Sequence, residues 1–371
     1  GVRAQRDSRN PGNRAASSAG ATGNARHSGL LGSVAGTRLR GSRSTASKRH
    51  HPCAASIGSG ASAWSSDCRF PEAATIQLFA VSGVDRRFLD FKGRPVKRPR
   101  DASHEAAFRD VDGDGDPDLY VTSDFGPPDR FWLNNGKGIF QEVHPLAMRR
   151  TSWFSMGLDF TDLNRDGYLD FITADMLSRW HKRRKTQMGF MQPTEVIIGL
   201  IANQPQIMQN TLQLNRGDGT WAEVAQYSGL EASEWSWGVA FSDVDLDGYE
   251  DLLVATGMIR DFMDGDTFAR VKKEDPKDLK SLALTSNWFP KLPTQNMAYR
   301  NKGDLTFEFV STDWGFDTKA VSGGLVQADF DGDGDLDLIF NNLGPAPLEI
   351  YRNESSAPRV AVRLIGKGPN T

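Results

Sequence analysis

Asp110-Val-Asp-Gly-Asp-Gly-Asp-Pro-Asp118 is the stretch of sequence that decides the fold of this chain. It places carboxylates at its positions 1, 3, 5 and 9 and a glycine, Gly115, at position 6. Ca²⁺ is a hard cation that takes about six to eight oxygen ligands, which acidic side chains and a backbone carbonyl can supply from one turn. The glycine allows a positive φ where the turn is sharpest. The stretch therefore predicts a calcium loop.

The same pattern starts again at residues 162, 243 and 329, so the chain has four loops in register. Four copies indicate a repeat architecture. The expected ligands of about four Ca²⁺ ions are the side chains at positions 1, 3, 5 and 9 and the carbonyl of position 7. These residues are Asp110, Asp112, Asp114, Asp116 and Asp118; Asp162, Asn164, Asp166, Tyr168 and Asp170; Asp243, Asp245, Asp247, Tyr249 and Asp251; and Asp329, Asp331, Asp333, Asp335 and Asp337. Because Asn164 lowers the charge of the second loop, that loop is expected to be the weakest site.

The segments around the first loop predict four short antiparallel strands. They span residues 106–108, 119–122, 130–133 and 139–143, and the last two are joined by a turn that contains Asn135-Gly136. Asn-Gly between alternating apolar residues is a strong hairpin signal. Four such strands make one blade of a β-propeller. The predicted fold is therefore all-β, a partial propeller of four-stranded antiparallel blades with about four to five blades visible and with helical insertions.

A constant spacing links one copy to the next. Asn134, Asn215 and Asn301 each lie 28 residues before the loop that follows, which begins at Asp162, Asp243 or Asp329. The second and third copies instead carry insertions, roughly 176–208 and 257–296, with helices expected at 194–201 and 268–284. These insertions connect the second strand of a blade to the third. They are therefore expected to cover the face opposite the calcium loops.

The two ends of the chain differ from the repeats. The first 69 residues carry eleven Lys and Arg against two Asp, and residues 1–72 are predicted to be a disordered basic segment rich in Ser, Arg, Gly and Ala. Residues 76–355 are assigned to the propeller. Within them, residues 76–90 are interpreted as the outer hairpin of an earlier, degraded blade, because Phe88 matches the aromatic residue that follows each turn asparagine. Residues 357–371 are predicted to be the start of another, truncated domain.

Two other interpretations of the aspartate loops compete with the calcium site. An EF-hand or dockerin loop needs an acidic residue at position 12, where this chain has Val121, Thr173, Val254 and Phe340. Aspartate and glycine also form ordinary turns without a metal. However, three or four carboxylates within nine residues repel one another unless a cation is present, which favours the calcium interpretation.

The repeats resemble the FG-GAP/VCBS repeat β-propellers, whose calcium loops have the form seen in the integrin α-subunit propeller. Further segments are similar to the cartilage acidic protein 1/UnbV type, in which a propeller precedes an ASPIC/UnbV domain. Those segments are Trp153-Phe-Ser-Met-Gly157, residues 211–219, Trp235-Ser-Trp-Gly238 and residues 359–370. The resemblance implies a protein that is secreted or held in the cell envelope and has no established enzymatic chemistry.

Two classes of function remain open. The first is a calcium-binding scaffold for binding or adhesion, not an enzyme, whose partner is a protein or a glycan. The alternative is a propeller enzyme acting on polysaccharide, either a lyase or a quinone-dependent dehydrogenase. The sequence shows no catalytic candidate outside the metal loops. The acidic repeat region argues against a nucleic-acid partner, and no apolar run approaches the length of about 20 residues that a membrane helix needs.

Two side-chain groups outside the loops are also candidates for binding. Trp235 and Trp237 could form a ligand platform, although packing between blades is favoured. The run from His181 to Lys185 could bind an anionic polymer, although a solvated helix face is favoured.

Overall fold

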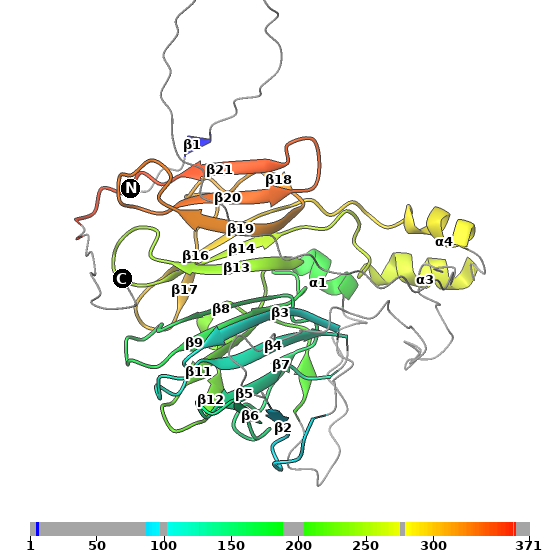
Figure 1. Cartoon of the computed structure of the whole chain (residues 1–371). Coiled ribbons are helices and arrows are strands. Elements are labelled where there is room, and N and C mark those ends of the chain that lie inside the picture. Colours follow the sequence, from blue (N-terminus) through cyan, green and yellow to red (C-terminus); the bar gives the residue numbers. More distant parts are fainter. Residues whose placement is uncertain are drawn as a thin grey trace, which may run out of the picture.

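The structure is a computed structural model that describes residues 5–6, 87–96, 102–125, 127–187, 204–274, 279–358 and 360. Four β-sheets follow one another in the order of the sequence (Figure 1). Each contains an antiparallel meander that corresponds to one predicted blade. The all-β, propeller-like architecture is thus confirmed. In the part of the chain that is described, no helix has both the length and the apolar character needed to cross a membrane.

The first blade contains the four expected strands and one more. Its strands are β3 (Ala102–Arg109), β4 (Asp118–Asp124), β5 (Arg130–Asn134), β6 (Ile139–Glu142) and β2 (Arg87–Leu89). β2 pairs in parallel with β6, with Phe88 opposite Phe140. The interpretation of residues 87–90 as part of a separate, degraded blade is therefore wrong. The ring of Phe88 stacks on Phe140 and meets the edge of Trp132, so burial of aromatic surface holds β2 against this sheet.

The second and third blades have the same meander order. The second consists of β8 (Gly157–Thr161), β9 (Asp170–Ala174), β11 (Thr211–Asn215) and β12 (Trp221–Glu223). The third consists of β13 (Ser236–Ser242), β14 (Asp251–Thr256), β16 (Met297–Asn301) and β17 (Phe307–Phe309). In every blade the aspartate loop joins the first strand to the second.

The fourth blade takes its outermost strand from the other end of the chain. It contains β19 (Ser322–Ala328), β20 (Asp337–Asn342) and β21 (Leu348–Arg352). β1 (Gln5–Arg6) pairs antiparallel with β21 and so lies where the fourth strand of a blade belongs. Two small two-stranded sheets account for the remaining strands of the described residues. They are β7 (Thr151–Ser152) with β10 (Gln206–Ile207), and β15 (Thr294–Gln295) with β18 (Lys319–Ala320).

Neighbouring blades pack face to face, and the first strands β3, β8, β13 and β19 are successive neighbours. β14 shows how one strand serves two interfaces. Its Leu252 and Val254 belong to the cluster shared with the second blade, and its Leu253 and Ala255 belong to the cluster shared with the fourth. Side chains alternate between the two faces of a strand, so a blade with a neighbour on each side must be apolar on both faces. All six residues of β14 are accordingly buried.

The helices belong mainly to the insertions. They are α1 (His181–Gln187), α2 (Ala225–Ser228), α3 (Gly265–Glu274) and α4 (Leu279–Ser286). The single helix expected at 268–284 is wrong, since this span holds two helices. Pro276 follows α3 in the sequence, and proline disrupts a helix interior because it lacks an N–H donor. Figure 1 shows α1, α3 and α4 on one side of the blades. Strands β9 and β14 begin at the aspartate loops, and the insertions follow the opposite ends of these strands.

Some expectations lie outside the described residues. These are the helix at 194–201, the hairpin residues 76–86, almost all of the basic segment 1–72, and residues 361–371 of the terminal segment.

Candidate metal sites

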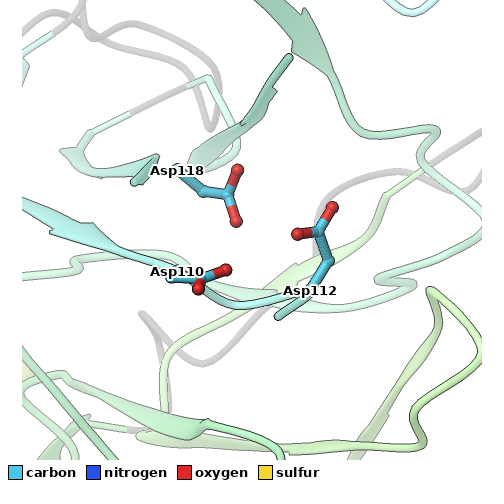
Figure 2. Close-up of side chains that lie close together, drawn as sticks. All are labelled: Asp110, Asp112 and Asp118. Carbon is cyan, nitrogen blue, oxygen red and sulfur yellow. The ribbon is translucent and has the colours of Figure 1, made fainter. Parts of the chain in front are cut away.

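Three of the four loops bring carboxylates together. Within each group, one carboxylate oxygen from each of the three aspartates lies within 4.8 Å of the other two. The groups are Asp110, Asp112 and Asp118; Asp243, Asp245 and Asp251; and Asp329, Asp331 and Asp333. Figure 2 shows the three carboxylates of the first loop turned toward a common point. Such a point is where several hard oxygen ligands could hold a divalent cation.

The second loop forms no such acidic group among the described residues. Its third position is Asn164, which donates from Nδ2 to Asp166 Oδ2 at 2.9 Å. Among the remaining expected ligands, those at position 5 act in local turns. The Asp114 and Asp247 side chains, for example, each accept a hydrogen bond from the N–H two residues on. Asp337 lies outside the acidic group of its loop.

The aspartate at position 1 shapes each loop. In all four loops one of its carboxylate oxygens accepts a hydrogen bond from the N–H of the glycine at position 6, at 2.9 to 3.1 Å. Those glycines have φ between 89° and 94°, a backbone conformation that residues with a Cβ atom rarely adopt. The glycine is therefore needed to bring the loop backbone back onto its first carboxylate.

The aspartate at position 9 binds backbone on both sides. Asp118 Oδ2 accepts from Val111 N at 2.9 Å, and Asp118 Oδ1 accepts from Asn134 N at 2.8 Å. The same two bonds recur at Asp170, Asp251 and Asp337. All four of these side chains are buried. Each therefore fastens its loop to the third strand of its own blade, whether or not it also contacts a metal.

Burial makes the loop carboxylates costly to ionise. Burial, together with repulsion from the neighbouring loop carboxylates, raises the pKa of Asp118 to about 6, that of Asp170 to about 7 and that of Asp251 to about 8. Burial also raises the pKa of Asp112. A nearby positive charge has the opposite effect, because it favours the ionised form. The loops thus have the electrostatic character of sites that a cation would stabilise.

The third loop provides the clearest fit to a metal. Asp243 Oδ1 and Asp245 Oδ1 are buried and have no hydrogen-bond partner. The Asp245 side chain is only 8% exposed. A buried carboxylate oxygen without a partner is unfavourable. A cation held between these oxygens and Asp251 would supply the missing interaction.

The turn asparagines are functional residues whose role the sequence did not reveal. Asn215 Nδ2 donates to Leu169 O in its own blade and to Val111 O in the first loop. Asn353 Nδ2 likewise reaches Val244 O in the third loop at 2.8 Å. These asparagines join one blade to the loop of the preceding blade. The signal in the sequence was the recurrence of an asparagine at this turn in every copy.

The candidates outside the loops have structural partners. Trp235 is buried and stacks on Trp237, whose Nε1 donates to Gly257 O at 2.7 Å. Within the basic run, Arg183 pairs with Glu234 and Asp261, and Arg184 pairs with Glu231. These contacts agree with packing for the tryptophans. They also show that two arginines of α1 form ion pairs with acidic residues of this chain.

Comparison with known proteins gives a family match and several likenesses to solved structures, of which one is described below. A family model described as FG-GAP-like repeat matches residues 110–173, 195–254 and 290–340. No curated protein sequence matches the chain. A solved structure, described as the basis of specific recognition of non-reducing terminal N-acetylglucosamine by an Agrocybe aegerita lectin, is 14% identical with a TM-score of 0.34. That match covers 68% of this chain and 50% of the lectin chain, so the chain spans about half of that length. The three matched segments each include strands and loop residues of the blades described above, and the chain therefore contains three segments similar to FG-GAP-like repeats.

Proposed function

We propose that this chain is a calcium-binding β-propeller that acts as a binding or adhesion scaffold outside the cell or in the cell envelope. The observation that carries the proposal is the third loop, where buried carboxylate oxygens of Asp243 and Asp245 converge with Asp251 and lack partners. FG-GAP-like repeats support the scaffold part of the proposal. The finer resemblance to the cartilage acidic protein 1/UnbV type, with residues 357–371 starting a further domain, belongs to the same proposal.

Calcium would act on the stability of the blades. Each loop joins the first and second strands of a blade and is tied to the third strand by the aspartate at position 9. A cation that neutralises the loop therefore stabilises three strands together. Because the ligands are assembled only in the folded chain, binding shifts the equilibrium toward the native state.

The partner of the scaffold is proposed to bind on the side that carries the insertions. α1 and α3 contact each other there. α1 carries the basic run from His181 to Lys185, whereas the repeated loops at the other end of the blades are acidic. Protein and glycan are the two classes of partner that the resemblance suggests. We propose a binding role rather than catalysis. Assaying uronate-containing polysaccharides for unsaturated products would test this, since turnover would contradict the scaffold proposal.

Removal of calcium should lower the melting temperature of the chain. At a free calcium concentration about 100 times the Kd, one site contributes about 2.7 kcal/mol. For a chain of this size that corresponds to a shift of several degrees, on the order of 5 °C. Differential scanning calorimetry with excess calcium and with excess chelator measures the shift.

A matched pair of variants makes this experiment specific. Asp112→Asn removes one loop carboxylate charge and should reduce the calcium-dependent shift. Asp313→Asn makes the same change at an exposed position outside the loops and should leave the shift intact. If chelator leaves the melting temperature of the unsubstituted chain unchanged, the calcium assignment is wrong.

A further inference from the structure

The residue before each turn asparagine divides the blades into two pairs. In the first and second blades this residue is Leu133 or Leu214, and in the third and fourth it is Arg300 or Arg352. The position lies at the end of the third strand, next to the asparagine that the position-9 aspartate holds. β16 pairs with β14 and β17, and β21 pairs with β20. This backbone pairing fixes the position of the Cα atom of each arginine.

Both arginines reach the same two positions of their loops. Arg300 Nη2 lies 2.5 Å from Asp245 Oδ2 and 3.5 Å from Asp247 Oδ2. Arg352 Nε lies 2.6 Å from Asp331 Oδ2, and its Nη2 lies 3.5 Å from Asp333 Oδ2. These aspartates occupy positions 3 and 5 of the third and fourth loops. The two contacts in each blade form the same guanidinium bridge across the loop.

In the third loop the arginine satisfies only one side of the acidic group. Asp245 Oδ2 faces Arg300, whereas Asp245 Oδ1 is buried without a partner, as is Asp243 Oδ1. The Asp245 side chain is 8% exposed. An unpartnered oxygen of a buried carboxylate points to a second cation at this loop, beside the guanidinium.

We propose that Arg300 and Arg352 are built-in cations that compete with calcium for positions 3 and 5 of their loops. This inference rests on the calcium-binding function proposed above, and it adds a way in which the calcium affinity of two loops is set. With the arginine in place, the third and fourth blades keep part of their charge balance when calcium is absent. Calcium must then share or displace the guanidinium, so these loops bind it more weakly than the first loop, where the equivalent residue is Leu133.

Calcium titration of the full chain tests the proposal. Arg300→Leu gives the third blade the residue found in the first two. One calcium site should then bind on the order of fivefold tighter, because an ion pair of this exposure is worth about 1 kcal/mol at most. The melting temperature in chelator should fall at the same time, since the loop has lost its internal cation. Isothermal titration calorimetry and differential scanning calorimetry provide the two readouts.

Two further variants separate direct contact from a general change of charge. Lys302→Leu removes the same charge two residues away and should change the affinity by less than about twofold, because an exposed charge in solvent interacts weakly. Leu133→Arg is the reverse exchange and should weaken calcium binding to the first loop. It also decides the matter if Arg300→Leu fails to fold.

The outcomes distinguish this inference from the function on which it rests. If the unsubstituted chain binds no calcium, both proposals fail. If that chain binds calcium but Arg300→Leu behaves like Lys302→Leu, or Leu133→Arg leaves the affinity of the first loop unchanged, the competition by arginine is wrong and the calcium scaffold stands. Tighter calcium binding in Arg300→Leu but not in Lys302→Leu, together with a lower melting temperature of Arg300→Leu in chelator, supports the competition by arginine.

Discussion

At the scale of single residues, the turn asparagines and the position-9 aspartates connect the repeats. Each asparagine donates its backbone N–H to the aspartate of its own blade, and its side chain accepts from the N–H two residues further on. In the second and fourth blades the side-chain amide also reaches the loop of the preceding blade. All four asparagines are therefore turn residues, and those of the second and fourth blades are interface residues as well.

Replacing Asn215 by alanine should cost about 2–3 kcal/mol of unfolding free energy. The change removes the amide that serves Val111 O and Leu169 O, and it does so at a buried position where lost partners are not replaced by water. The midpoint of urea unfolding measures this loss.

Asn134→Ala is the control for that substitution. The Asn134 amide donates to Pro117 O within its own blade and at an exposed site, so its loss should cost about 1 kcal/mol or less. Equal losses in the two variants would contradict the interface role of Asn215.

At the scale of elements, α1 ties the two insertions to the blades. The Arg183 side chain donates from Nε to Asp261 Oδ2 at 2.7 Å and from Nη2 to Asp261 Oδ1 at 3.1 Å, and it pairs with Glu234. Glu234 is fully buried and has a φ of 67°, which is unusual for a residue other than glycine. The Ser178 hydroxyl also donates to Glu234. One arginine thus neutralises acidic residues on two separate connections.

Arg183→Ala should destabilise the chain by about 3 kcal/mol, because it leaves the buried Glu234 carboxylate without its cation. Urea unfolding is again the measurement. Lys182→Ala changes an exposed residue of the same helix and should stay within about 0.5 kcal/mol of the unsubstituted chain. A loss in Arg183→Ala as small as that of the control would show that Glu234 finds other compensation.

At the scale of the whole molecule, the four blades follow one another without an equivalent neighbour beyond the fourth in the described residues (Figure 1). The result is an exposed apolar face. Val326, Ile339 and Ile350 lie opposite one another across β19, β20 and β21. Val326 is 60% exposed and Ile350 44%, whereas Phe340 and Tyr351, on the other face, are buried against the third blade.

We expect the chain to self-associate through this face as its concentration rises, since contiguous exposed apolar surface favours association. Ile350→Glu should reduce the association, as measured by sedimentation velocity over a range of concentrations. Tyr227→Glu places the same charge at another exposed residue, on α2, and should have little effect. A monodisperse monomer at all concentrations would contradict the prediction.

The sequence by itself determined the repeat unit. The spacing of carboxylates and glycine within nine residues defines each loop, and the turn asparagines and alternating apolar residues define the strands. All of these signals act over a few neighbouring residues. The structure accordingly has β3 to β6 where strands were expected, and it groups carboxylates in three of the four loops. The expectation that the second loop is the weakest calcium site likewise rests on one local residue, Asn164.

Only the tertiary structure decided which distant groups meet. Asn215 reaches Val111, which precedes it by 104 residues, and Arg300 reaches Asp245 across the third blade. β2 pairs with β6 of the first blade, although its aromatic residue had suggested a blade of its own. Such contacts depend on how sheets stack and on where a long side chain ends after packing. No spacing of residue types encodes either of these, because each contact joins segments whose relative position arises only when the blades assemble.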